Sequence, residues 1–196
     1  MKVIGLTGGI GMGKSFIAAA FARHGVAAHD ADRVVHALMA RGGRAVPAIA
    51  KAFPGVVRGG AVDRARLGAL VFDDPSALAR LEAILHPAVR RSQQAFLQRQ
   101  RRAGRSLALL DVPLLLETGN AAGADLIVVA SAPPAVQASR VLRRPGMSRA
   151  RLESIRARQM SDREKRRRAD VVIRTGLSRQ HTLGQVRRLL ARLRAR

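Results

Sequence analysis

The amino-acid sequence predicts an α/β protein: a parallel sheet of about five strands with helices on both faces, a helical insert and a lid. Short apolar runs alternate along the chain with stretches of helical periodicity, which is the pattern of strands joined by crossover helices. Several of these runs are almost uninterrupted, as expected for strands that are buried on both faces.

Five segments have the composition of buried strands, and the first is followed by a glycine-rich loop and a helix. That helix is expected over residues 13–24, because apolar residues repeat at helical spacing and Gly25 provides a stop. A last, amphipathic helix is expected from Ser178, because leucine and valine recur along one face. The strands are expected at residues 3–7, 26–29, 106–110, 126–130 and 171–173.

Two segments interrupt this alternation and divide the chain into a core, an insert and a lid. The expected core comprises residues 1–32, 105–137 and 169–196. Residues 33–104 form a long, mostly helical insert between the second and third strands. Residues 138–168 are rich in Arg and poor in large apolar side chains, so we expect a loosely packed, mobile basic lid.

Within the insert, two helices are expected on either side of a His-Pro pair. Asp74 offers an N-cap, and Pro75 occupies the first helical position before leucines at helical spacing. His86 and Pro87 are expected to end this helix and to begin a second one that runs to Gly104. A His-Pro pair is typical of a helix start, so no catalytic role is assigned to His86.

The charge of the chain is strongly positive, with 36 Lys and Arg against 13 Asp and Glu and a formal net charge of +23. Such a field can attract nucleic-acid backbones. The chain has five Phe but no Tyr or Trp, so it lacks the aromatic platforms on which single strands stack. Its arginines are also scattered through every segment. We therefore favour an enzyme with polyphosphate ligands and do not expect a nucleic-acid partner.

The sequence gives no sign of a membrane or secreted protein. No apolar run approaches the roughly 18 residues that span a bilayer. Glycines and Lys14 interrupt the N-terminal apolar run, so a secretory signal is not expected. The chain has no Cys, which fits a reducing compartment. We expect a cytoplasmic protein.

The glycine-rich loop matches the pattern G-x-x-x-x-G-K-[ST] in full and lies between an expected strand and an expected helix. Glycines let several backbone N–H groups point at one anion, and the helix adds its positive N-terminal end. Lys14, one of four lysines in an arginine-rich chain, is expected to bind the β- and γ-phosphates of ATP, and Ser15 to bind Mg²⁺. The alternative is a glycine-rich turn that precedes a helix by chance. The expected nucleotide-binding residues are Gly8, Gly9, Ile10, Gly11, Met12, Gly13, Lys14 and Ser15, with Phe16 after them.

Three carboxylates follow expected strands, where a parallel sheet would deliver them to the edge that holds phosphate. Asp111 ends the third strand and is expected to hold the magnesium shell. Asp30 and Asp32 follow the second strand, and Asp32 is the candidate that orients the acceptor hydroxyl and accepts its proton. The alternative role for either aspartate of this pair is a helix N-cap.

Together these motifs resemble the dephospho-coenzyme A kinase family over nearly the whole chain. The phosphate loop alone is common to many kinases, but its combination with the other motifs in this order is far more specific. The matching segments are G-L-T-G-G-I-G-M-G-K-S at residues 5–15, D-A-D at 30–32, L-H-P at 85–87, D-V-P-L-L-L-E at 111–117, Q-M at 159–160 and A-D-V-V-I at 169–173.

The resemblance implies transfer of the ATP γ-phosphoryl group to the ribose 3′-hydroxyl of dephospho-coenzyme A, on a P-loop core with an acceptor-binding insert and a lid. It implies that Asp32 is the base and that residues 33–104 bind the acceptor. Arg140 and Arg144 match lid arginines that would close over the transferring group, although either could be a solvated surface charge. We expect ATP and Mg²⁺ as cofactors and a monomer or weak homo-oligomer.

The sequence departs from the family pattern at three places. Arg174 and Thr175 stand where the family usually has Asp-Asn, so adenine recognition would rest on the backbone or on other side chains. Pro145 follows Arg144 where Asp is usual, which changes the expected local geometry of the lid. Phe16 replaces a small hydroxyl residue outside the required motif.

Two other functions remain open from the sequence. One is a P-loop kinase of another small acceptor, a nucleoside monophosphate or a sugar. The other is a basic nucleic-acid-binding ATPase, whose turnover nucleic acid would stimulate. A GTPase is disfavoured, because the sequence contains no N-K-x-D pattern to read guanine.

Overall fold

The chain forms two compact units in the computed structural model. The first unit comprises Met1–His29 and Arg99–Arg196, and the second comprises Asp30–Gln98, which overlaps the predicted insert. The residues that the structure describes are 1–72, 74–117 and 123–195.

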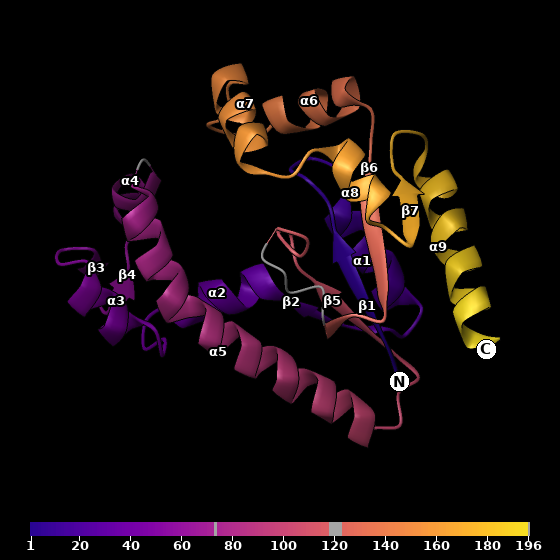
Figure 1. Ribbon diagram of the computed structural model, residues 1–196, viewed down its shortest axis with the longest axis horizontal. Helices are drawn as coiled ribbons and strands as arrows, with labels where there is room; N and C mark the ends of the chain where they lie inside the picture. The colour runs from indigo at the N-terminus through magenta and orange to yellow at the C-terminus, as the bar shows by residue number, and fades with distance from the viewer. Residues whose placement is uncertain (73, 118–122, 196) are drawn as a thin grey trace. The chain divides into compact units, whose positions relative to one another are not determined.

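The first unit is built on a five-stranded sheet with the strand order β2-β5-β1-β6-β7 (Figure 1). β1 pairs in parallel with both β5 and β6, and β6 pairs in parallel with β7. Because parallel strands end at the same edge, the residues that follow these strands meet there. The predicted α/β class is confirmed. The strands are β1 (Lys2–Thr7), β2 (Ala27–Asp30), β5 (Leu107–Asp111), β6 (Leu126–Ser131) and β7 (Val171–Arg174).

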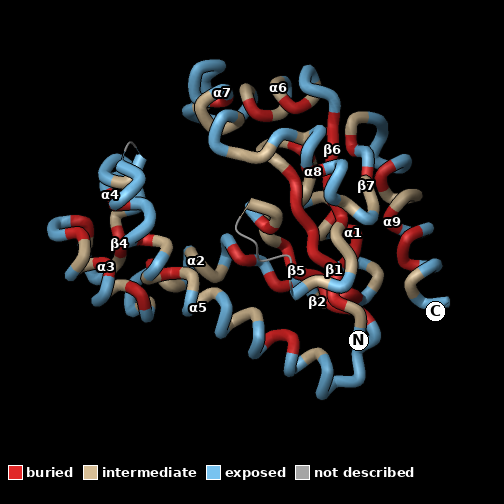
Figure 2. Tube along the Cα trace, in the orientation of Figure 1, coloured by how far each residue is buried: buried red, intermediate tan, exposed pale blue. Residues whose placement is uncertain are grey.

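Helices of the first unit cover the sheet and enclose one apolar core. Every residue of β5 is buried, and Figure 2 shows the central strands as the most buried part of this unit. Phe21 of α1 and Val186 of α9 are fully buried in the same core. The predicted last helix is confirmed, and Ser178 is its N-cap, because the Ser178 side chain accepts from the His181 N–H. The helices are α1 (Lys14–Arg23), α6 (Pro134–Leu142), α7 (Arg149–Arg158), α8 (Asp162–Arg167) and α9 (Arg179–Arg194).

The second unit is mostly helical, as predicted, and has its own apolar core around Ile49 and Phe53. It also contains a short antiparallel hairpin that was not predicted. Gly59 and Gly60 form its two-residue turn with φ of 55° and 78°, and positive φ at both positions is what a type I′ hairpin turn requires. The elements of this unit are α2 (Ala31–Met39), α3 (Val46–Ala52), β3 (Val57–Arg58), β4 (Ala61–Val62), α4 (Arg64–Phe72) and most of α5 (Pro75–Arg102).

The predicted break at His86 and Pro87 is wrong, because α5 continues through both residues as one helix of 28 residues. An interior proline costs about 3 kcal/mol, since it removes one backbone hydrogen bond and its ring crowds the preceding turn. Buried side chains on both sides of Pro87, including Leu85 and Phe96, favour a continuous helix. Full burial of one such side chain stabilises by about 1.5–3 kcal/mol, so a few of them outweigh the proline. His86 therefore lies inside a helix and does not start one.

The predicted N-cap at Asp74 is confirmed. Its Oδ1 accepts from the backbone N–H groups of Ser76 and Ala77 at 2.8 and 3.0 Å. The bond from Ala77 is the largest cause that lowers the pKa of Asp74 below its ordinary value of 3.8.

Among the described residues, no helix is both long enough and apolar enough to cross a membrane.

Candidate active site

The glycine-rich loop connects β1 to α1 and has the backbone geometry of an anion cradle. Gly11 and Gly13 have φ of 72° and 88°, a left-handed conformation that side chains disfavour. Space is also lacking: a Cβ on Gly11 would lie 2.6 Å from Val141 Cγ2, and one on Gly13 would lie 2.9 Å from Thr175 Oγ1. No side chain among the described residues caps α1. Its first N–H groups can therefore bind an anion.

Lys14 and Asp111, predicted separately from the loop and from the third strand, form an ion pair. Lys14 Nζ lies 2.5 Å from Asp111 Oδ1, and the two side chains are 16% and 8% exposed. The β1–β5 register sets Asp111 beside Leu6, two residues before the loop begins. A cation and a carboxylate thus lie together at the end of β5, beside the glycine-rich loop.

The groups around the loop fit Mg²⁺ held jointly with phosphates. Mg²⁺ usually keeps several waters and takes one or two carboxylates plus phosphate oxygens. Ser15, in the first turn of α1, is exposed and offers a hydroxyl, and Asp111 offers the carboxylate. Within residues 1–72, 74–117 and 123–195 there is no cluster of three or more His, Asp or Glu that would hold a metal without the nucleotide.

The two aspartates at the end of β2 have different roles. Asp30 is the N-cap of α2, because its Oδ1 accepts from the Arg33 N–H at 3.0 Å. Asp32 lies two residues further on, in the first turn of α2, and is exposed. Asp30 is therefore the helix N-cap of this pair, and the Asp32 carboxylate is exposed to solvent. The base role of Asp32 stays a prediction.

Arg140 of α6 contacts the phosphate loop and the turn after β7. Its guanidinium donates to Thr175 Oγ1 at 2.9 Å and to the Thr175 carbonyl at 2.5 Å, and reaches the Gly11 carbonyl at 3.4 Å. The Thr175 hydroxyl in turn donates to the Met12 carbonyl at 2.7 Å. Arg144 is exposed beyond the end of α6. The structure thus brings Arg140, but not Arg144, to the loop.

A pocket of about 210 Å³ lies beside these groups in the first unit. Gly13 and Phe16 line one part of it, and Arg140, Thr175 and Leu177 line another. Its position at the loop, with an arginine and an aromatic ring in its lining, suits a planar base. Thr175 was noted in the sequence only as a departure from the family, and Leu177 was not noted at all.

Sequence reasoning also missed a group of polar side chains that hold the top of the loop. Gln159 Oε1 accepts from the Ile10 N–H at 3.0 Å, and Gln137 Nε2 donates to the Ile10 carbonyl at 2.8 Å. Arg156 donates to Gln137 Oε1 from Nε and Nη2, at 3.0 and 2.6 Å. Nothing in the spacing indicates the two contacts to Ile10, because they join residues more than 100 positions apart. Gln159 did belong to the family resemblance.

Comparisons with known proteins agree on one family. A family model described as dephospho-CoA kinase matches residues 2–179. A dephospho-CoA kinase of Paramagnetospirillum magneticum is 60% identical over 85% of this chain and 78% of its own length. One from Mesorhizobium japonicum is 51% identical over 99% of this chain and 98% of its own.

Solved structures extend the likeness to the fold. A protein from Thermus thermophilus, 36% identical, superposes with a TM-score of 0.86 over 98% of this chain and 97% of its own. A dephospho-CoA kinase from Campylobacter jejuni, 20% identical, has a TM-score of 0.64 over 98% of this chain and 97% of its own, and supports the fold alone. The extent of the family match and the identity to its members over nearly the full length establish that this chain belongs to the dephospho-CoA kinase family.

Proposed function

We propose that the chain catalyses ATP-dependent phosphorylation of the ribose 3′-hydroxyl of dephospho-coenzyme A, the last step of coenzyme A biosynthesis. The observation that carries the proposal is the Lys14–Asp111 pair at the mouth of the glycine loop. It supplies the cation and the metal-binding carboxylate that phosphoryl transfer from ATP needs. The family match carries the choice of acceptor.

The loop and Lys14 would hold the β- and γ-phosphates of ATP. Mg²⁺, when bound between the phosphates, Ser15 and Asp111, would neutralise charge that develops on the phosphate oxygens. Arg140 would fix the loop through the Gly11 carbonyl and form a wall of the neighbouring pocket, which would take adenine. Because phosphoryl transfer needs little covalent chemistry from the protein, these groups act by position and charge.

Asp32 would accept the proton of the attacking ribose hydroxyl. Its carboxylate is exposed, and the helix-capping contact at this end of α2 is made by Asp30 instead. Asp32 lies in the first turn of α2, and a carboxylate is one of the side chains that act as general bases.

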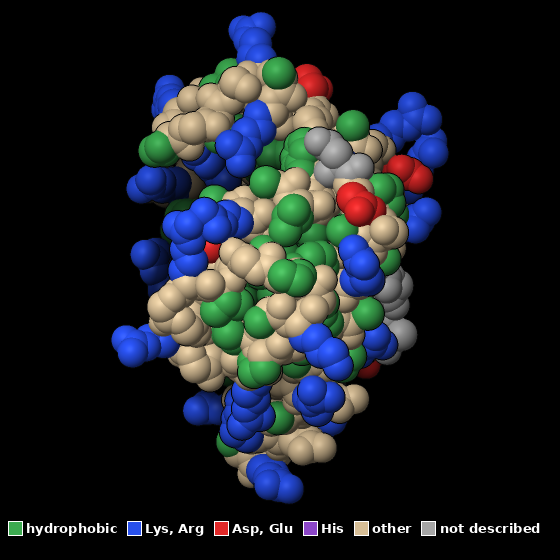
Figure 3. All heavy atoms as spheres, turned by 90° about the vertical axis from the view of Figure 1, so that its left-hand side faces the viewer, with side chains coloured by type: hydrophobic (Ala, Val, Ile, Leu, Met, Phe, Trp, Pro, Cys, Tyr) green, Lys and Arg blue, Asp and Glu red, His purple; other side chains and the backbone are tan. Residues whose placement is uncertain are grey.

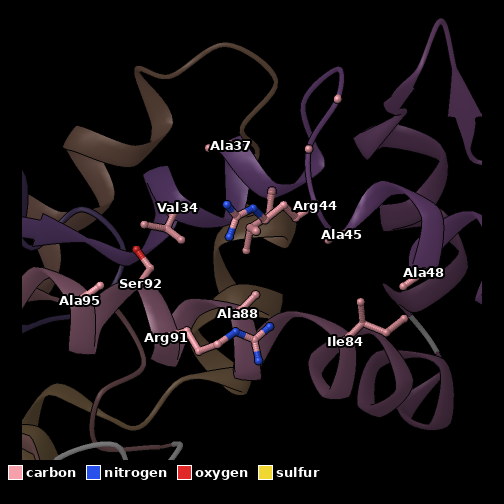
Figure 4. A pocket seen from close by; sticks show the side chains of 13 residues that line it. Val34, Ala37, Arg44, Ala45, Ala48, Ile84, Ala88, Arg91, Ser92 and Ala95 are labelled. Carbon is pink, nitrogen blue, oxygen red and sulfur yellow. The ribbon is translucent and has the colours of Figure 1, made fainter.

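The second unit contains a pocket that would hold the rest of the acceptor. Its volume is about 770 Å³, and it lies between α2, the loop before α3, and α5 (Figure 4). Val34 and Ile84 give it an apolar lining, while Arg44 and Arg91 extend into the same space from opposite sides. Two like charges facing one space favour an anion between them. Dephospho-coenzyme A has both features, a diphosphate and a long, largely uncharged pantetheine chain.

The positive charge over the rest of the protein surface is consistent with polyphosphate substrates. Figure 3 shows Lys and Arg side chains spread over the visible face with few acidic groups between them. A distributed field of this kind steers polyphosphate ligands toward the protein and raises their on-rates at low salt. We place the reaction in the cytoplasm and expect a monomer or a weak homo-oligomer.

The test is an acceptor assay with purified protein, ATP and Mg²⁺. We expect phosphorylation of dephospho-coenzyme A, and no comparable reaction with nucleoside monophosphates or sugars. Turnover of a nucleoside monophosphate in place of dephospho-coenzyme A would refute the proposal. ATP turnover that requires DNA or RNA would instead favour the nucleic-acid-binding alternative.

A further inference from the structure

Lys165, in α8, is a buried cation that the mechanism above does not use. Its side chain is 1% exposed, in a chain whose basic residues are mostly at the surface. Nζ forms an ion pair with Glu117 Oε1 at 2.7 Å and donates to the Pro113 carbonyl at 3.2 Å. A lysine is rarely buried this fully without such partners. The two contacts tie α8 to the chain segment that leaves β5.

The Pro113 carbonyl joins three parts of the site. It accepts from Lys165 and also from Thr7 Oγ1, at 2.8 Å. Thr7 is the last residue of β1 and directly precedes the glycine loop. Pro113 follows Asp111 by two residues. The position of this carbonyl, fixed by two donors, therefore sets where the chain runs just after the metal-binding carboxylate.

Glu117 extends the same connection to the nucleotide loop. Its Oε1 also accepts from the Met160 N–H at 3.1 Å. The residue before Met160 is Gln159, whose side chain accepts from the Ile10 N–H at the top of the loop. The segment from Gln159 to Lys165 thus contacts the loop at one end and the chain beyond Asp111 at the other.

We infer that Lys165 is a positioning residue, which holds the Asp111 carboxylate in place for Mg²⁺ through the Pro113 carbonyl and Glu117. The inference rests on the proposed function. Mg²⁺ requires near-ideal octahedral geometry, so a small shift of one ligand weakens Mg²⁺ binding. Loss of groups that orient a metal ligand lowers metal affinity by roughly 10–100-fold. Loss of Lys165 therefore raises the Mg²⁺ requirement of the enzyme.

The experiment compares Lys165→Met with Lys51→Met, the same substitution at an exposed lysine of α3. Two quantities are measured for each: the Mg²⁺ concentration that half-saturates turnover, and the one that half-saturates the Mg²⁺-dependent rise in Tm at fixed ADP. We expect both to increase roughly tenfold or more in Lys165→Met and to stay at the wild-type value in Lys51→Met. Wild-type values in both variants would overturn the inference.

A second variant separates positioning from stability. Lys165→Met leaves Glu117 without its cation, which lowers Tm, whereas Lys165→Met with Glu117→Leu replaces the pair by apolar groups and restores Tm in part. We expect the raised Mg²⁺ requirement to persist in the double variant. Recovery of the Mg²⁺ requirement together with Tm would show that the pair only stabilises the fold. If Lys165→Met alone does not fold, the Mg²⁺ requirement can be measured in the double variant instead.

Thr7→Val addresses the same carbonyl without disturbing the ion pair. It removes the other donor to Pro113, so we expect a smaller rise in the same Mg²⁺ requirement. A wild-type requirement in this variant would refute the part assigned to the Pro113 carbonyl. Wild-type enzyme that phosphorylates no acceptor would instead refute the proposed function, and the ADP thermal measurement, which needs no turnover, would still test Lys165.

Discussion

Replacing Lys14 by Met should lower both the stability of the free protein and its turnover. The substitution keeps most of the side-chain volume but removes the ammonium that lies 2.5 Å from Asp111 Oδ1. Exposed ion pairs contribute about 0–1 kcal/mol, and breaking a buried pair costs about 3–5 kcal/mol. With side chains 16% and 8% exposed, this pair lies nearer the buried case, so we expect a loss of roughly 2–3 kcal/mol.

This loss can be measured by thermal unfolding. For a chain of this size, about 1 kcal/mol shifts Tm by roughly 2–4 °C, so Lys14→Met should unfold about 4–12 °C below wild type. Wild type should gain about 2.7 kcal/mol from MgATP at 100 times its Kd, and the variant should gain little. Turnover should fall by at least about 10²–10³-fold, the loss seen when one charge-stabilising donor is removed from an active site.

Two further variants make this result interpretable. Lys51→Met tests whether removal of any lysine lowers Tm, and it should not. Adding Asp111→Asn to Lys14→Met removes the negative charge that Lys14 no longer neutralises, so part of the stability should return while turnover stays low. A Lys14→Met protein with wild-type Tm, or one that still turns over at the wild-type rate, would contradict the reasoning.

Three other changes have distinct expected outcomes. Asp32→Asn should lower kcat by roughly 10²–10⁴-fold with little change in the KM for ATP, and near-normal turnover in steady-state assays would remove this residue from the mechanism. Arg91→Ala should raise the KM for dephospho-coenzyme A about tenfold, about 1.4 kcal/mol, and leave the KM for ATP unchanged; an equal effect on both substrates would contradict the acceptor pocket. Asp74→Asn keeps a capping oxygen but removes the charge. Because the folded pKa of Asp74 is lowered, wild type should be more stable than the variant above pH 3.8 and should lose this advantage as the pH falls through the folded pKa. A difference in Tm between the two proteins that persists in acid would refute this.

The sheet was predictable because each strand carries its own local signal. The buried runs were located to within one residue at either end, and the carboxyl end of β5 placed Asp111 at the edge where the loop begins. The glycine loop was predictable because its glycines serve local backbone geometry. Gly11 and Gly13, for example, have the positive φ that the motif implies.

The course of α5 was not predictable from local rules. Pro87 signals a break, and only the burial of side chains on both sides of it explains why the helix continues. The β3–β4 hairpin was not predicted because its strands have only two residues each, which is too short for a periodic pattern. The Gly59-Gly60 turn is by itself a clear local signal.

The polar contacts around the loop were not predictable because they join distant parts of the chain. Thr175 reaches the Met12 carbonyl across 163 residues, and Gln159 reaches Ile10 across 149. Sequence spacing carries no information about such pairs until the sheet order is known. The family pattern marked position 175 as unusual, but only the structure shows that its hydroxyl links the loop to Arg140.

The pairing of Lys14 with Asp111 also affects how the site can be filled. In the free protein each charge satisfies the other, but the proposed mechanism gives Lys14 to phosphate and Asp111 to Mg²⁺. ATP alone would take Lys14 and leave Asp111 facing phosphate oxygens of its own sign, while Mg²⁺ alone would take Asp111 and leave Lys14 next to a divalent cation. Either half-filled state would then carry a like-charge contact at short range in a partly buried site. Under the proposed mechanism MgATP would satisfy both groups at once, so the ion pair would disfavour partial occupation of the site and favour binding of the complete complex.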